Sequence, residues 1–204
     1  MKLKHHKEIV NMLYDEWDLG KQSSNAKGKI CAWIYWFEIL SQTEQLITQE
    51  ENNEVIGVCG YSKWNSRKHL SRKKYYKILR SILLHSPLIK NKEAIYKYNN
   101  DYNYLPKELE NYFDGEISIL IVRKDYRGKN IGKELLTKIF ELAEKDNMNN
   151  LQILSDESCN YKFYEKLGCR AVYETTIPNG EPDKCGNISS EKGFIYEKIL
   201  RRHI

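Results

Sequence analysis

The chain has 204 residues, of which 41% are hydrophobic and 30% are charged, a composition typical of a folded globular protein. No apolar run approaches the roughly 18 residues that a membrane-spanning helix needs, and the polar N-terminus lacks a secretory signal. We therefore expect one cytoplasmic domain, residues 1–204, with no membrane partner. The five cysteines are scattered and form no Cys-x-x-Cys pair, which argues against a disulfide framework and against a zinc site.

The net charge of +5 conceals a segregated charge distribution. Between Lys63 and Lys97 there are eleven basic residues and one acid, so this stretch carries +10 and the rest of the chain −5. Acids prevail from Asp101 to Glu116, where the charge is −4. The basic residues of this stretch and the tyrosines between them could contact phosphates and bases, so nucleic acid is an alternative partner. We prefer a solvated cationic face, because its apolar residues recur at helical intervals.

The N-terminal part of the chain predicts two helices and a hairpin. Apolar spacing indicates a helix over residues 6–19, followed by a polar loop to Lys29 and then a second, densely apolar helix. Two short runs rich in β-branched residues, 46–49 and 55–61, flank a turn-forming cluster and predict a β-hairpin.

The middle of the chain predicts a helical insertion before a buried strand. Residues from Trp64 to about Tyr98 read as two helices broken at Pro87, within an insertion of about 64–113. Residues 116–122 form a nearly continuous apolar run, which indicates a buried strand.

The remaining elements complete an α/β pattern. A polar turn over 123–130 leads into an amphipathic helix over 131–145. The last elements expected are a strand at 151–154, a short helix at 160–167 stopped by Gly168, and strands at 171–177 and 193–200.

The turn between the buried strand and the amphipathic helix has the composition of an anion site. It reads Arg127-Gly128-Lys129-Asn130-Ile131-Gly132-Lys133. Amides at a helix N-terminus lack intrahelical partners, and the helix dipole favours an anion there. Glycines permit close approach and positive φ, and the basic side chains add charge. The expected ligand is a phosphate or pyrophosphate, although the pattern is neither a Walker A loop nor a dinucleotide-binding Gly-x-Gly-x-x-Gly.

At these residues the chain resembles the GNAT superfamily of acetyl-CoA-dependent N-acetyltransferases. The family signature is Arg/Gln-x-x-Gly-x-Gly/Ala; Arg127, Ile131 and Gly132 fit it, and Asn130 replaces the usual first glycine. Asn tolerates the left-handed backbone better than most residues, so the change is mild. Residues 160–169, Asn-Tyr-Lys-Phe-Tyr-Glu-Lys-Leu-Gly-Cys, are similar to the family's Phe-Tyr-x-x-Leu-Gly-Phe box.

The resemblance implies a fold and a co-substrate. The fold would be a mixed, mostly antiparallel twisted sheet, splayed at its central strands and flanked by helices, with a helical insertion before the key strand. The co-substrate would be acetyl-CoA. Its pantetheine arm would pair with Leu120, Ile121 and Val122, and its pyrophosphate would be held by Gly128, Lys129, Asn130, Ile131, Gly132 and Lys133, with Arg127 and Asn160 as further cofactor-binding residues.

Acetyl transfer by direct attack needs a neutral amine, a donor for the oxyanion and a proton for the leaving thiolate. The resemblance implies that Tyr164 donates that proton. Glu116 is the candidate base, although many family members carry the strand glutamate two residues later, where this chain has Ser118. Asp156 is the competing base or a helix cap. A water chain without a dedicated base is the third alternative, and an acyl intermediate on Cys159 is disfavoured because no His lies near it in sequence.

The acceptor is expected to be a small cationic amine, because aromatic residues and acids occur together in the two segments that would surround it. Those residues are Trp33, Trp36, Tyr102, Tyr104, Tyr112, Phe113, Asp101, Glu108, Glu110 and Asp114.

The five histidines have no metal-ligand spacing and are interpreted as surface residues, and we expect no metal. A cofactor-binding protein without transferase activity is the other alternative. The oligomeric state is expected to be a monomer or a homodimer.

Overall fold

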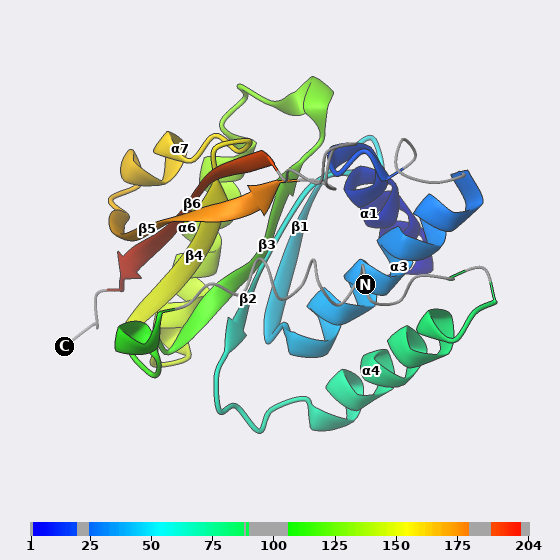
Figure 1. Cartoon of the computed structure of the whole chain (residues 1–204), viewed down its shortest axis with the longest axis horizontal. Coiled ribbons are helices and arrows are strands. Elements are labelled where there is room, and N and C mark those ends of the chain that lie inside the picture. The colour runs from blue at the N-terminus through cyan, green and yellow to red at the C-terminus, as the bar shows by residue number, and fades with distance from the viewer. Residues whose placement is uncertain (1, 20–24, 88, 90–105, 180–188, 201–204) are drawn as a thin grey trace. The chain divides into compact units, whose positions relative to one another are not determined.

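The computed structural model describes residues 2–19, 25–87, 89, 106–179 and 189–200 (Figure 1). They fall into two compact units, a first unit of residues 1–90 and 118–145 and a second unit of residues 91–117 and 146–204. The expectation of a single domain over 1–204 stays a prediction. Within the described ranges, no helix combines the length and the apolar character needed to cross a bilayer.

Strand β3, Gly115–Val122, begins in the second unit and ends in the first. The strand order is therefore β1-β2-β3 in the first unit and β3-β4-β6-β5 in the second. Strands β3 and β4 are parallel, whereas β1 with β2, β4 with β6 and β5 with β6 are antiparallel. The predicted fold class, a mixed and mostly antiparallel sheet flanked by helices, is confirmed.

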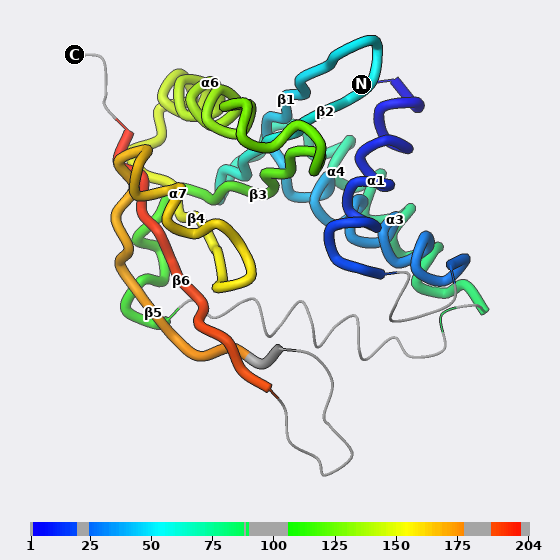
Figure 2. Tube along the Cα trace, turned by 90° about the horizontal axis from the view of Figure 1, so that it is seen from above, coloured from blue at the N-terminus to red at the C-terminus, as the bar shows by residue number. Residues whose placement is uncertain are grey.

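In the first unit, helices cover both faces of the strands (Figure 2). Helices α1, Leu3–Glu16, and α3, Asn25–Gln42, bury a core in which Leu13 and Trp36 pack with Val58 of β2, Glu54–Lys63. Helix α6, Ile131–Lys145, packs on the other face, since a Cβ at Gly57 would lie 2.8 Å from Leu135. The first unit is thus a layered α/β structure.

Helix α3 begins within the segment that was expected to be a loop. Glycine and polar residues predicted a loop as far as Lys29, but α3 starts at Asn25. A Cβ at Gly28 would lie 2.5 Å from the carbonyl oxygen of Leu19 and 2.8 Å from Tyr14. The glycine is needed for the close approach of α3 to the end of α1 rather than for a turn.

The predicted hairpin is confirmed. Strand β1, Gln45–Glu51, pairs with β2 through the turn residues Asn52 and Asn53, which have φ of 52° and 62°. Positive φ at both central positions is the type I′ geometry, which matches the twist of paired strands and which asparagine tolerates.

One helix of the basic insertion, α4 at Leu70–Leu84, lies in the described residues and ends before Pro87 as predicted; the second expected helix lies outside them. The expected cationic outer face is found only in part: Lys74 and Lys77 are exposed and Leu84 is buried, but two of the apolar residues are exposed as well. Ile78 and Ile82 are 50% and 61% exposed. Arg72 instead donates to the carbonyl oxygens of Thr43 and Glu44, and Lys73 pairs with the Glu44 carboxylate.

The second unit contains β4, Asn150–Asp156, β5, Arg170–Asn179, β6, Ser189–Ile199, and the short helix α7, Lys162–Glu165. Single-turn 3₁₀ helices lie at Lys107–Leu109 in this unit and at Lys124–Tyr126 in the first. Register pairs place Glu116, Gln152, Glu197 and Arg170 in one row across β3, β4, β6 and β5. Paired residues share a face of the sheet, so this row gathers polar groups.

Candidate functional site

The turn after β3 has the backbone geometry of an anion site. Gly128 and Asn130 have φ of 80° and 62°, and α6 starts at the next residue, Ile131. The amide of Glu134 donates to the carbonyl of Asn130 at 3.0 Å. The amides of residues 131–133 therefore precede the helical hydrogen-bond ladder, where they are suited to an external acceptor. The left-handed Asn130 explains how asparagine replaces the glycine of the family signature.

Arg127 holds this turn in place. Its Nη2 lies 2.5 Å from the Glu16 carboxylate of α1, and its Nε donates to the Val122 carbonyl at 3.1 Å. At the end of β3, the Arg123 amide donates to the Ile56 carbonyl of β2 at 2.9 Å. The guanidinium of Arg127 thus ties the turn to both α1 and β3.

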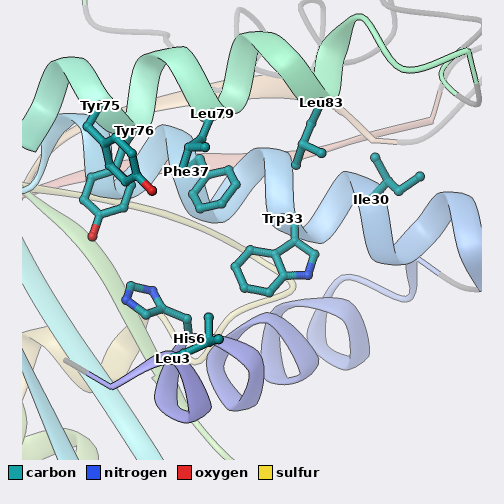
Figure 3. Close-up of a pocket in the computed structure, with 9 residues that line it drawn as sticks. All are labelled: Leu3, His6, Ile30, Trp33, Phe37, Tyr75, Tyr76, Leu79 and Leu83. Carbon is teal, nitrogen blue, oxygen red and sulfur yellow. The ribbon is translucent and has the colours of Figure 1, made fainter.

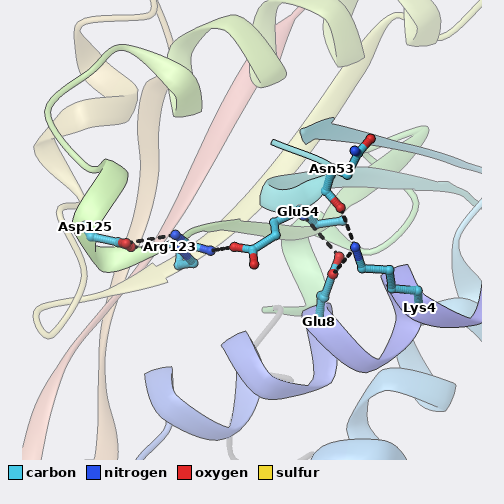
Figure 4. Close-up of polar contacts among 7 residues, drawn as sticks. Lys4, Glu8, Asn53, Glu54, Arg123 and Asp125 are labelled. Atoms are coloured by element: carbon cyan, nitrogen blue, oxygen red, sulfur yellow. Dashed lines mark hydrogen bonds and ion pairs between the residues drawn. The ribbon is translucent and has the colours of Figure 1, made fainter. Parts of the chain in front are cut away.

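A chain of polar contacts fixes the end of β3 to the hairpin (Figure 4). Arg123 contacts the carboxylates of Asp125 and Glu54, at 2.9 and 2.8 Å. The backbone amide that follows Glu54 donates to Glu8 of α1 at 3.1 Å, and Lys4 pairs with Glu8. These contacts connect the end of β3 to the hairpin and the hairpin to α1.

The other cations of the turn differ in environment. The Lys129 ammonium lies 4.5 Å from the centre of the Tyr126 ring, a cation–π contact. Lys133 and Asn130 line a surface cavity of about 450 Å³ along the first turns of α6.

Of the strand residues predicted to pair with a cofactor arm, Ile121 is buried, and Leu120 and Val122 are half-buried.

In the second unit, Glu116 is held by Gln152. The Gln152 Nε2 donates to Glu116 Oε2 at 3.2 Å, and Gln152 is itself 3% exposed. Burial raises the pKa of Glu116, and this hydrogen bond opposes the rise only in part. A carboxylate with a raised pKa accepts a proton more readily near neutral pH, as a general base must.

Asp156 closes the turn that follows β4 and does not cap α7, whose N-cap residue is Tyr161. Its Oδ1 accepts from the amides of Ser158 and Cys159 and from the Ser158 hydroxyl, at 2.9, 3.1 and 2.6 Å. Burial, with the negative charge of Asp156, raises the pKa of Cys159 to about 11. That thiol is therefore protonated at neutral pH, which disfavours an acyl-cysteine step.

The second motif forms the turn around α7. The Asn160 carbonyl accepts from the Phe163 amide at 3.0 Å, which starts the helical turn, and Gly168 ends it with φ of 71°. The half-buried Tyr164 ring packs 5.5 Å from Phe163 and 5.6 Å from Tyr196. The sequence-based expectation of a helix stopped by Gly168 is confirmed, with a helix of one turn.

The described residues expected around the acceptor belong to both units, and several of them are core residues or are held by other side chains. Trp36 and Phe113 are core residues at 0% and 3% exposure, and Trp33 lines a pocket between helices. The Asp114 carboxylate accepts from the amide and side chain of Asn149. Glu108 and Glu110 are exposed, and Asp101, Tyr102 and Tyr104 lie outside the described residues.

Sequence reasoning missed a buried polar cluster in the second unit. Glu197 is 2% exposed and accepts from the Tyr112 hydroxyl at 2.6 Å and from Arg170 at 2.7 Å. These hydrogen bonds outweigh burial and lower the pKa of Glu197. Residues 193–200 are predicted to form a strand. The partners of Glu197, Tyr112 and Arg170, come from segments far apart in the chain, so no local pattern predicts these hydrogen bonds.

Both motifs lie within the range of a family model. The model described as an acetyltransferase (GNAT) domain matches residues 95–169. No protein of the curated set matches the chain in sequence. The sequence match is therefore carried by the segment that contains the turn and the residue 160–169 box.

Solved structures with a similar fold extend over nearly the whole chain. Arylalkylamine N-acetyltransferase 2 from Aedes aegypti is 19% identical, with a TM-score of 0.57 over 98% of this chain and 97% of that one. The smu.2055 protein from Streptococcus mutans UA159 is 14% identical, with a TM-score of 0.55 over 98% and 97%. An N-acetyltransferase from Staphylococcus aureus Mu50 is 16% identical, with a TM-score of 0.51 over 96% and 94%. At these identities the likeness concerns the fold.

Proposed function

Because this chain carries a GNAT acetyltransferase domain, we propose that it transfers the acetyl group of acetyl-CoA to a primary amine of a small acceptor. The turn over residues 127–133 carries the proposal. Its left-handed Gly128 and Asn130 present the amides of residues 131–133 at the N-terminus of α6, as a pyrophosphate requires.

The residues present fit the co-substrate. The flexible pantetheine arm would lie along Leu120–Val122 by main-chain pairing, as an added strand does. Its pyrophosphate would bind the amides of the turn, with Lys133 supplying charge. Since Arg127 already contacts Glu16 and the Val122 carbonyl, we assign it to holding the turn rather than to direct contact. Asn160 stays a proposed cofactor contact.

The chemistry assigns two residues to proton transfer. Tyr164 would donate a proton to the departing thiolate of coenzyme A while the amine nitrogen forms its bond to the acetyl carbon. Glu116, whose pKa is raised by burial, would accept the proton that the amine loses. The three donors on the Asp156 carboxylate favour a structural role for it.

The pyrophosphate assignment is tested by Gly132→Phe. A bulky side chain in the first turn of α6 should abolish the calorimetric signal of acetyl-CoA binding while the circular dichroism spectrum stays native. Lys145→Phe places the same ring on the exposed last turn of the same helix and should leave binding unchanged. Unaltered affinity in Gly132→Phe, or equal loss in both variants, would refute the assignment.

The proton donor is tested by Tyr164→Phe. Turnover should fall by about 10²-fold, the effect of a general acid, with cofactor affinity nearly intact. Tyr173→Phe, on β5, is the control for loss of a tyrosine hydroxyl elsewhere in the same unit. A rate equal to that of the parent protein would remove Tyr164 from the mechanism.

The acceptor is proposed to be a small cationic amine, and the cell compartment the cytoplasm. Release of the coenzyme A thiol across a panel of polyamines, aromatic amines and amino-acid derivatives would identify the acceptor. Thiol release with none of them, despite tight acetyl-CoA binding, would favour the non-catalytic cofactor-binding alternative. The nucleic-acid alternative loses support, because Arg72, Lys73 and Arg80 of α4 contact α3 and the segment that follows it.

A further inference from the structure

A pocket of about 560 Å³ opens between α1, α3 and α4 of the first unit (Figure 3). Aromatic rings from two helices form one side of it: Trp33 and Phe37 from α3, and Tyr75 and Tyr76 from α4. Every lining residue belongs to these three helices, so the pocket is separate from β3 and from the turn over residues 127–133. Its volume is in the range of sites that hold small organic molecules.

The rings form a continuous wall. Trp33 and Phe37 have centroids 5.3 Å apart, Phe37 and Tyr76 stack at 6.0 Å with an interplanar angle of 21°, and Tyr75 meets Tyr76 edge-on at 5.5 Å. Aromatic surfaces of this kind favour a flat ring, by stacking or edge-to-face contact.

His6 adds a polar group to this wall, which corrects its interpretation as a surface residue. The buried Trp36 donates its Nε1–H to His6 Nδ1 at 2.8 Å, and burial lowers the pKa of His6. A neutral imidazole that accepts at Nδ1 carries its proton on Nε2. The hydrogen-bond network thus assigns His6 as a donor and leaves it uncharged at neutral pH.

The charge around the pocket is positive. Helix α4 contains no acid, and two of its five cations are neutralised, Lys73 by Glu44 and Arg80 by Glu38. Arg72, Lys74 and Lys77 have no ion pair among the described residues. The lining residues include no carboxylate. Burial raises the pKa of Tyr76 and the positive charge of Arg72 lowers it, which places that charge close to the aromatic wall. Such a field attracts an anion and repels an ammonium group.

We propose that this pocket binds a small aromatic anion, one or two rings bearing a carboxylate or sulfonate. The rings would lie against Trp33, Phe37 and Tyr76, and the negative group would face Arg72, about one helical turn from Tyr76. This ligand differs in charge from the amine acceptor and in position from the acetyl-CoA turn, so the site adds a binding function to the proposed transferase.

The test compares two ligands of opposite charge on the full chain. Anilinonaphthalene sulfonate should bind saturably, one per chain, in calorimetry. Naphthylmethylammonium, an aromatic cation, should bind at least about tenfold more weakly. Saturating acetyl-CoA should leave the sulfonate bound. Absence of saturable sulfonate binding, equal affinity for the cation, or displacement by acetyl-CoA would each overturn the proposal.

Adjacent variants on α4 locate the site. Leu79→Asp places a carboxylate in the pocket wall and should weaken sulfonate binding by about tenfold or more. Ile78→Asp adds the same charge one residue earlier, on a side chain that is 50% exposed and outside the lining, and should change affinity much less.

If Leu79→Asp is not folded, Leu3→Asp makes the same comparison from α1, where the side chain is 67% exposed. Equal losses in the pocket variant and in Ile78→Asp would refute the assigned location. These measurements do not involve acetyl transfer, so a negative result would refute the binding proposal without bearing on the transferase proposal.

Discussion

Replacing Lys73 with glutamine removes the cation from a carboxylate that is almost completely buried. Glu44 is 1% exposed, and the Lys73 ammonium lies 2.9 Å from its Oε2. The other carboxylate oxygen, Oε1, has no hydrogen-bond partner among the described residues. The variant therefore leaves a negative charge in a site that excludes water.

The expected loss of unfolding free energy is at the lower end of the range for such a change. Removing one partner of a buried ion pair costs about 3–5 kcal/mol. Arg72 remains nearby, bound to the Glu44 carbonyl, and Lys73 is 13% exposed, so part of the loss is compensated. We expect about 3 kcal/mol, which in a chain of this size lowers Tm by roughly 6–12 °C.

Urea denaturation followed by circular dichroism measures the loss, and Lys74→Gln is the matched control. The Lys74 side chain is exposed and has the same charge, so its replacement should cost less than about 0.5 kcal/mol. Adding Glu44→Gln to Lys73→Gln removes the orphaned charge and should restore most of the stability. Equal effects of the two lysine variants would refute the structural role assigned to Lys73.

Three further changes test other parts of the structure. Glu116→Gln should raise Tm at pH 7, because a carboxyl whose pKa is raised by burial destabilises the fold once it is ionised. The gain in Tm should vanish at acid pH, where the carboxyl is protonated. If Glu116 is the base, turnover should fall by about 100-fold in the same variant. Gly28→Ala should lower stability in a thermal melt, since overpacking against Leu19 costs about 1–3 kcal/mol and the helix propensity of alanine returns about 1 at most. Cys159 should react with iodoacetamide at pH 8 on the order of 100-fold more slowly than a free thiol, with a rate that rises toward pH 11; fast alkylation at pH 8 would contradict its raised pKa.

Local signals predicted much of the fold. The helix over 131–145 and the strand that precedes it follow from apolar periodicity, and the structure places α6 and β3 within one residue of those limits. The hairpin and the left-handed Asn130 follow from asparagine chemistry. In each case the interactions that determine the structure are between residues close together in the chain, so the local sequence is enough to predict it.

Tertiary contacts decided the features that sequence reasoning misplaced. Gly28 predicted a loop but lies inside α3, where a glycine is needed because the carbonyl of Leu19 leaves no room for a Cβ. The spacing of α4 predicted its inward residues only in part: Leu84 is buried, but Ile78 and Ile82 are exposed. Arg72 and Lys73 instead contact the carbonyls and the carboxylate after α3.

The amino-acid sequence by itself determined the order of elements, the turn over residues 127–133 and the second motif, since each depends on the backbone preferences of neighbouring residues. Only the folded chain decided that Gln152 holds Glu116, that Trp36 sets the protonation of His6, and that three helices enclose an aromatic pocket. Burial and charge pairing depend on residues that are far apart in the chain and close in the fold, so no local sequence pattern predicts them.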